Sequence, residues 1–360
     1  MRDQFGVSRG LLALGHTAEA RRILEFYWNI WQHHGRIHNA QAAGVDGVFH
    51  VHENDAVEIT GYLILQAFDL LEKTGDEDFL RHIFPMLDWA FEAQKRELAG
   101  GMLPFNGDET YIAGGILPRS TINDGSAEAT LLFLDSGEKL LAWARRNGAW
   151  KSDVLEENGL VLAATRRQYR ANFWRDGRLR TNNPQRLAVI QPPRFRHGVC
   201  ERCVEQGTLR GIEWTERSTS GRYLCPRCLA RGPYSPATPT FYELRSVSLA
   251  PIYFRSTFFD RSELRPLVEE IAGLYQATGR LPSRPDDPHG ATVGYDYGLL
   301  LYALVELGHP LARLLYEKTL SLLDPAGAWV EYYLHHRPAG TRCRPWESAI
   351  NIEALLHYAS

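Results

Sequence analysis

The 360-residue chain lacks the features that mark a membrane-spanning, disordered or fibrous protein. It has no run of about 18 or more apolar residues, so we expect no membrane span. Its opening, MRDQFGVSRG, has no apolar core of a secretory signal; either the protein stays inside the cell or the sequence begins downstream of the true start. With 44% hydrophobic and 23% charged residues, the composition excludes intrinsic disorder, collagen-like repeats and a disulfide-stapled mini-protein.

Several sequence motifs with known chemistry are also missing. No Gly-rich phosphate loop and no repeat period of about 34 residues is present. Five histidines fall within 20 residues, but no HExxH or carboxylate spacing accompanies them, so we predict no metal site there. These histidines are His33, His34, His38, His50 and His52. What remains is a globular chain, long enough for one large domain or two.

Charge is unevenly distributed along this chain, whose formal net charge is −3. Between Arg166 and Arg231 there are 15 arginines, no lysine and 5 acidic residues, which gives +10. The remainder carries 25 basic and 38 acidic residues, which gives −13. A basic block within an acidic protein indicates an inserted segment with its own surface, and it raises the question of nucleic-acid binding.

Four of the five cysteines lie in this basic block, as two Cys-x-x-Cys pairs. The pairs are Cys200 with Cys203 and Cys225 with Cys228, and 21 residues separate them. Each pair lets two thiolates face one side of a tight turn, so two pairs predict a tetrahedral Zn²⁺ site. Four thiolates leave no open coordination position, so we expect the zinc to be structural and the compartment to be reducing and cytoplasmic. Cys343 is expected to be an unpaired thiol.

Apolar periodicity predicts helices, not strands, over most of the chain. About eleven are expected, near residues 5–14, 17–34, 55–73, 77–98, 125–147, 151–171, 241–257, 261–277, 293–307, 309–323 and 345–359. Short links such as Gly75-Asp76 alternate with long polar links such as 35–54 and 99–124. Short links produce antiparallel helical hairpins, and the long ones are expected to gather at one end of the stack, where sites are usually built. This alternation predicts a helical toroid or solenoid.

The long links also hold acidic and aromatic residues in an order that resembles a known family. The segments are Arg2-Asp3, the loop 101–111, the run 327–333 (GAWVEYY), and 344–349 (RPWESA). They resemble the six-hairpin (α/α)6 glycosidases, above all the glucoamylase-like family, glycoside hydrolase family 15. The resemblance implies an all-α (α/α)6 toroid of helical hairpins. In this family a helix and a tryptophan precede the Arg-Asp motif, and this chain has neither before Arg2. Two forms of the toroid are therefore expected, a complete one and one that lacks its first helix.

The resemblance also implies roles for individual residues. Arg2 and Asp3 match the motif that holds the terminal sugar. Glu109 lies where the family has its general acid, in an Asn-Gly-Asp-Glu run without the family's Trp, and Glu331 matches the general base. The further residues expected to contact the sugar are Asp108, Tyr111, Trp329, Trp346 and Glu347.

Glycoside chemistry fits this assignment, because it requires one protonated carboxyl group and one ionised carboxylate. Glu109 and Glu331 occupy two different long links, as required of groups on either side of a pocket. Each has a simpler interpretation as a solvated loop carboxylate. Glu128 competes with Glu109 for the acid role, although a carboxylate in a first helical turn also favours the helix dipole. The same interpretation is open for Glu347.

The sequence therefore predicts three parts: residues 1–191 and 240–360 as the toroid, and 192–239 as a zinc-ribbon insertion. The first hypothesis is an inverting glycoside hydrolase that releases sugar from the end of an α-glucan or oligosaccharide. The second is a non-catalytic toroid whose basic ribbon binds nucleic acid or protein, with nucleic acid not favoured. A third keeps the fold but catalyses phosphorolysis or sugar epimerisation. No oligomeric state is predicted.

Overall fold

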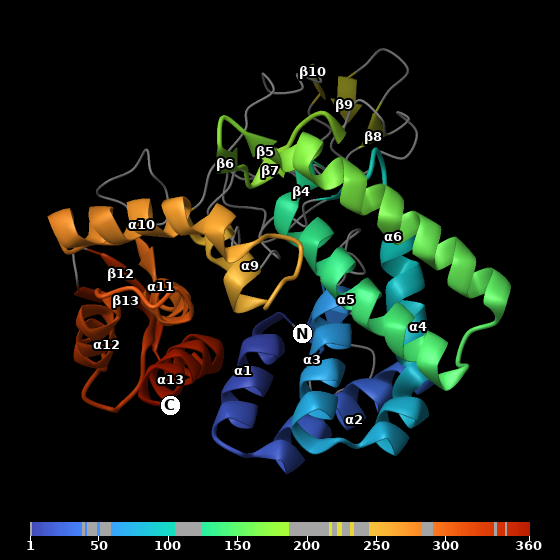
Figure 1. The fold of residues 1–360 in the computed structure, drawn as a ribbon, viewed down its shortest axis with the longest axis horizontal. Helices are drawn as coiled ribbons and strands as arrows, with labels where there is room; N and C mark the ends of the chain where they lie inside the picture. Colours follow the sequence, from blue (N-terminus) through green and yellow to red (C-terminus); the bar gives the residue numbers. More distant parts are fainter. Residues whose placement is uncertain are drawn as a thin grey trace.

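A computed structural model describes residues 2–37, 40–41, 49–50, 59–104, 124–186, 216–217, 222–224, 231–233, 245–282, 291–334, 337–342 and 344–360. Within these ranges it contains eleven α-helices, one 3-10 helix and several small antiparallel sheets (Figure 1). The helices are α1 (Arg2–Ala13), α2 (Thr17–His34), α3 (Ile59–Thr74), α4 (Glu77–Arg96), α5 (Ala127–Asn147), α6 (Ser152–Phe173), η3 (Arg245–Ser248), α9 (Ala250–Tyr253), α10 (Arg261–Thr278), α11 (Asp296–Glu306), α12 (Ala312–Ser321) and α13 (Pro345–Ala359). The mainly helical class predicted from the sequence is confirmed.

The strands form five small sheets, all with antiparallel pairing. Two are two-stranded: β1 (Ala40–Gln41) with β2 (Phe49–His50), and β5 (Trp174–Arg175) with β6 (Arg178–Leu179). Three are three-stranded, in the orders β3-β4-β7, β10-β9-β8 and β11-β12-β13. Their strands are β3 (Leu103–Pro104), β4 (Gly125–Ser126), β7 (Asn182–Asn183), β8 (Glu216–Arg217), β9 (Arg222–Leu224), β10 (Arg231–Pro233), β11 (Thr292–Val293), β12 (Val330–Leu334) and β13 (Arg337–Arg342).

The helix ends carry the signals that terminate helices in general. Asp76 accepts from the Phe79 amide at the start of α4, and the Ser126 hydroxyl does the same for Ala129 at the start of α5. Gly148 ends α5 in the left-handed backbone conformation that glycine adopts most easily. Local sequence therefore sets most helix boundaries.

Two segments differ from the sequence-based prediction. The single helix expected over 241–257 is divided between η3 and the short α9, and the chain leaves α9 through Arg255 with a left-handed φ of 56°. The run 327–342, expected as a loop, forms the hairpin of β12 and β13. A period of two over five residues, interrupted by a bulge between Val330 and Tyr332, is too short to be recognised as a strand in the sequence.

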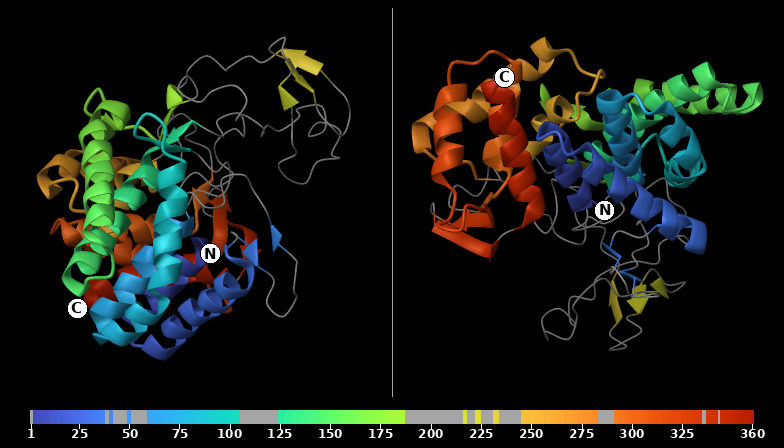
Figure 2. Two further views of the ribbon diagram at one scale, coloured as in Figure 1. Left: turned by 90° about the vertical axis from the view of Figure 1, so that its right-hand side faces the viewer. Right: turned by 90° about the horizontal axis from the view of Figure 1, so that it is seen from below.

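Helices from the two ends of the chain pack against each other. α1 contacts α13, α2 and α3, and α3 in turn contacts α4 and α5 (Figures 1 and 2). On the other side of α13 lies α11, which also contacts α9, α10 and α12. Gly10 makes the approach of α1 to α13 possible, because a Cβ atom there would lie 2.7 Å from the Ala349 Cβ. The core thus runs continuously from α1 through both halves of the chain.

The connections between helices alternate in length, as the sequence indicates. The links after α1, α3, α5 and α11 are short, whereas long links precede α3, α5, α11 and α13. The longest link, 174–244, precedes η3 and α9. The long links therefore arrive at the N-terminal ends of α3, α5, α11 and α13 and at η3. No helix within the described ranges has the length and apolar character needed to cross a membrane. The predicted division at residues 191 and 240 stays a prediction.

Candidate functional site

Three of the predicted site residues converge on one arginine. Arg344, just before α13, hydrogen-bonds through Nη1 to Oε1 of Glu331 on β12. Its Nη2 lies 3.3 Å from Oδ2 of Asp3 in α1, and its Nε lies 3.5 Å from Oε2 of Glu347 in α13. Asp3 and Arg344 are 341 residues apart in the chain, so tertiary folding alone creates this group. We call Asp3, Glu331, Arg344 and Glu347 the Arg344 cluster.

Local sequence places each member of the Arg344 cluster. Pro345 starts α13, and Glu347 follows in its first turn, where a carboxylate is favoured by the helix dipole. Glu331 is fixed by the β12–β13 hairpin, since its Oε2 also accepts from the Thr341 amide at 3.1 Å. Gly340, which precedes Thr341 in β13, has a φ of 74°. A Cβ atom at Gly340 would lie 2.5 Å from the Tyr332 ring, so only glycine fits there.

The electrostatics of the Arg344 cluster are unbalanced. Three carboxyl groups share one guanidinium, so the formal charge is negative when all three are ionised. Glu347 is completely buried, and the nearest cation is Arg344, whose Nε lies 3.5 Å from its Oε2. Burial raises the pKa of Glu347 to about 7, against the opposing effect of Arg344. The cluster therefore holds a carboxyl group that exchanges a proton near neutral pH.

A second acidic group lies at the N-terminal end of α5. Glu128 is buried and accepts a hydrogen bond from the Tyr62 hydroxyl of α3. Asp124 accepts from the Asn182 amide at 2.8 Å, and its burial raises its pKa to about 7. Glu128, the competitor for the acid role, is thus engaged by the protein itself.

The predicted acid and its neighbours lie outside the described residues. They are Asp108, Glu109 and Tyr111, within the segment 105–123. Both ends of this segment are fixed, because β3 before it pairs with β4 after it, and β4 leads directly into α5. Arg2 begins α1 next to Asp3.

Two of the three predicted aromatic contacts are described, and both are buried. Trp329 is 4% exposed, and its indole N–H donates to the Thr319 carbonyl at 2.9 Å, so we assign this ring to the core. Trp346 is 5% exposed and packs edge-to-face on Tyr295. The Arg344 guanidinium lies 5.6 Å from the centre of the Trp346 ring, so the face of this ring packs against the cluster.

The four zinc-site cysteines and Cys343 also lie outside the described residues. Cys225 and Cys228 fall in sequence between β9 and β10, which pair antiparallel with Leu224 opposite Arg231. Among the described residues, no group of three or more His, Cys, Asp and Glu side chains is suited to hold a metal ion. His33 and His34 are exposed at the end of α2, while His38, His50 and His52 have no described side chain.

Part of the basic block neutralises the acidic body of the protein. Arg166 pairs with Glu138 at 2.7 Å, and Arg170 pairs with Glu263 at 2.8 Å. Arg178 pairs in the same way with Glu270, whereas Arg180 lies 3.4 Å from Asp176, an acidic residue of the block itself. These arginines are engaged within the chain, which weakens the argument that the block exists to bind nucleic acid.

Sequence reasoning missed Arg344 as the centre of the cluster. The residue stood in the RPWESA run, but a lone arginine before a helix carries no spacing signal that separates it from an ordinary surface cation. It also missed a polar hollow around Arg9 and Arg255, described below, because its residues are spread from 9 to 353.

Comparison with known proteins gives a fold but no family. The structure is similar to that of an uncharacterized conserved protein from Thermus thermophilus, with a TM-score of 0.57 and 12% sequence identity. The match covers 98% of this chain and 92% of that chain. At this identity the two share a fold, and nothing follows about activity. No family model matches the sequence, and no curated protein does.

Proposed function

We propose that this protein is a glycoside hydrolase built on an (α/α)6 toroid, acting on the end of an α-glucan or a short oligosaccharide. The observation that carries the proposal is the convergence of Asp3, Glu331 and Glu347 on Arg344. All three belong to the segments that resemble the glucoamylase-like family. Their meeting at the N-terminal ends of α1 and α13 supports a single polar site.

Helix packing supports the toroid. In the proposed arrangement, α1, α3, α5, α9, α11 and α13 form an inner ring, and α2, α4, α6, α10 and α12 form an outer one. The contact of α13 with α1 would close the inner ring, and each inner helix before α13 precedes its outer partner through a short link. The long links then reach the N-terminal ends of the inner helices, which is the end that carries the Arg344 cluster.

The chemistry of glycoside cleavage suits a cluster with excess negative charge. The transition state has oxocarbenium-ion character, so a positive charge develops on the sugar ring. Carboxylates fixed in position before the reaction stabilise that charge without reorganising. Glu331, positioned by Arg344 and the Thr341 amide, would activate the attacking water, and Asp3 would hold a sugar hydroxyl.

The proton donor in this proposal is Glu109, in the segment between β3 and β4. The pairing of β3 with β4 fixes both ends of the segment at the N-terminal end of α5, on the same ends of the inner helices as the Arg344 cluster. Inversion would require the Glu109 and Glu331 carboxyl groups to lie about 6.5–9.5 Å apart, with room for water between them.

The substitution Glu331→Gln tests the proposal. Glutamine keeps the size of the side chain and one acceptor oxygen, which can still accept from Arg344, but it cannot take a proton from water. Release of sugar from α-linked gluco-oligosaccharides should fall by about a hundredfold or more, with the thermal midpoint little changed. Glu317→Gln on α12, which removes an exposed carboxylate paired with Arg313, is the matched control.

Two outcomes would reject the hydrolase. One is undiminished turnover in Glu331→Gln, and the other is no sugar release by the unaltered protein from any member of the oligosaccharide panel. Turnover that requires inorganic phosphate would replace hydrolysis by phosphorolysis on the same site.

We also propose that Cys200, Cys203, Cys225 and Cys228 bind one structural Zn²⁺. The donor set is the four-thiolate set that zinc prefers, and the pairing of β9 with β10 brings the two flanks of the second cysteine pair together. Bound zinc would fold a segment too short to build its own core. The metal content of the purified protein, expected to be one zinc per chain, tests this assignment.

A further inference from the structure

A cavity of about 300 Å³ lies at the opposite end of α1 and α13 from the Arg344 cluster. It is lined by Arg9, Leu12, Ala13, Asp69, Glu72, Lys73, Arg255 and Glu353. Arg9 follows Asp3 by six residues in α1, and Glu353 follows Glu347 by six in α13, a rise of about 9 Å along each helix. The cavity is therefore a separate site on the same two helices.

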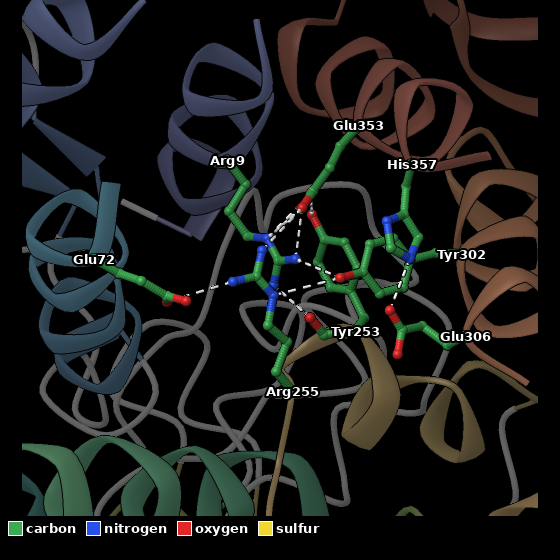
Figure 3. Close-up of polar contacts among 8 residues, drawn as sticks. All are labelled: Arg9, Glu72, Tyr253, Arg255, Tyr302, Glu306, Glu353 and His357. Carbon is green, nitrogen blue, oxygen red and sulfur yellow. Dashed lines mark hydrogen bonds and ion pairs between the residues drawn. The ribbon is translucent and has the colours of Figure 1, made fainter. Parts of the chain in front are cut away.

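The floor of the cavity is a fully bonded ion pair. Arg9 Nε lies 2.9 Å and 3.0 Å from the two oxygens of Glu353, and its Nη2 lies 2.6 Å from Oε1 (Figure 3). Arg9 Nη1 donates to the Tyr253 carbonyl, and the Tyr253 hydroxyl donates to Glu353 at 2.8 Å. Both charged side chains are buried, so the floor is satisfied and rigid before any ligand arrives.

The polar side chains at the rim of the cavity, by contrast, make few or only long contacts with the rest of the protein. Arg255 is half exposed, and its contacts are long: 3.4 Å to the Tyr302 hydroxyl, 3.5 Å to Glu72 and 4.0 Å to Glu353 (Figure 3). Asp69 and Lys73 make no hydrogen bond or ion pair with any described residue. Burial raises the pKa of Asp69, while Arg9 and Arg255 lower it. Asp69 and Lys73 thus lack a bonding partner among the described residues, and Arg255 has only long contacts.

The backbone at Arg255 is also unusual. Its φ of 56° is left-handed, a conformation that costs energy for a side chain other than glycine. The other such residue in the described ranges is Asp176, a type that tolerates this conformation better. Figure 3 shows that this backbone directs the Arg255 guanidinium toward Arg9 and Glu353. An arginine with a strained backbone and weak contacts within the chain indicates a side chain positioned to bind a ligand.

We propose that this cavity binds a neutral, polyhydroxylated ligand of about the size of one sugar ring. Three cations and three carboxyl groups line it, so it has no net formal charge to attract an anion or a cation. A hydroxyl group both donates and accepts, so it can pair with the carboxylates Asp69 and Glu72 as well as with Lys73 and Arg255. Leu12 and Ala13 supply a small apolar wall for C–H groups, and the volume is at the lower end for small-molecule sites.

Binding of defined small molecules tests this proposal independently of any catalytic activity. The neutral probes are glucose, galactose, xylose and myo-inositol, and the charged probes are glycine and inorganic phosphate. Binding of each probe is measured by calorimetry and saturation-transfer NMR. Arg255→Asn removes the guanidinium and keeps a residue that accepts a left-handed backbone, while Asp69→Ala removes an unpartnered acceptor. Each should weaken binding of the preferred polyol by about tenfold or more. Arg313→Gln, which removes an exposed arginine on α12, should leave the affinity unchanged.

Since the Arg344 cluster is proposed to bind sugar as well, Arg344→Gln separates the two sites. Polyol binding that survives Arg344→Gln and is lost in Arg255→Asn supports the cavity, whether or not the hydrolase proposal holds. The cavity proposal is overturned if no polyol binds, if glycine or phosphate binds in preference, or if only Arg344→Gln abolishes binding.

Discussion

At the scale of single residues, the group that governs the candidate site is a buried carboxyl group. Glu347 is completely buried beside Arg344, so its ionised form lacks water and has one cation to stabilise it. Its protonated form loses less on burial, which is why its pKa rises to about 7 from an ordinary 4.5. Glu347 is therefore better suited to hold Arg344 in place than to contact a sugar directly.

The raised pKa of Glu347 has a defined effect on stability. Between about pH 4.5 and about pH 7 the folded protein binds this proton more tightly than the unfolded chain does, so its contribution to stability falls as the pH rises through that range. Glu347→Gln abolishes this dependence. From about pH 4 to about pH 8, the variant should gain about 3 kcal/mol of unfolding free energy relative to the unaltered protein.

Urea denaturation at several pH values checks this prediction, with the exposed Glu317→Gln as the control that should not alter the pH profile. Parallel pH profiles for Glu347→Gln and the unaltered protein would show that Glu347 titrates normally.

At the scale of elements, the β12–β13 hairpin determines where Glu331 lies. Gly340 and Gly327 have similar left-handed backbone angles, with φ of 74° and 77°. Comparing alanine substitutions at the two positions therefore separates the free-energy cost of a left-handed alanine from the cost of steric crowding. A Cβ atom at Gly327 meets nothing within 4 Å, whereas one at Gly340 meets Tyr332 at 2.5 Å and the Glu331 Cβ at 3.0 Å. The two positions are therefore matched except for the crowding beneath the strand.

Both alanine substitutions should destabilise the fold by about 1 kcal/mol or more, because each forces a left-handed alanine. Gly340→Ala should cost more than Gly327→Ala, and it should also reduce any turnover that depends on Glu331. Denaturation and activity measurements on the two variants check this prediction. Equal effects in both would mean that the crowding at Gly340 is relieved without moving the strand.

At the scale of the whole molecule, the contact between α1 and α13 joins the two ends of the chain. Gly10 lies at the closest approach, where a Cβ atom would be 2.7 Å from the Ala349 Cβ, 2.9 Å from its Cα and 3.0 Å from its carbonyl oxygen. These neighbours are backbone or directly attached to it, so they cannot rotate away. The two helices would have to separate, and the separation would disturb the Arg344 cluster and the Arg9–Glu353 pair together.

Gly10→Ala should therefore lower the unfolding free energy by about 2 kcal/mol, although alanine favours a helix. Gly273→Ala in α10 is the matched control, since its Cβ meets nothing within 4 Å, and it should stabilise the protein by up to about 1 kcal/mol. Chemical denaturation of both variants gives the comparison. A neutral or stabilising Gly10→Ala would show that α1 and α13 are free to shift.

Local sequence patterns are enough to predict most of the helices, the alternation of their links and the acidic residues placed in those links. These features depend on neighbours a few positions away: apolar spacing along α2 and α5, and caps such as Asp76 and Ser126. Local patterns also pointed to Glu331 and Asp3, because motifs keep their order along a chain.

Which of these residues meet depends on how the helices pack. Arg344 joins Asp3 to Glu331 across almost the whole length of the chain, and Arg9 joins Glu353 in the same way. Nothing in a local pattern specifies such a pair, because its partners come together only when α1 packs against α13. The same packing buries Glu347, which raises its pKa, and it places Trp329 in the core.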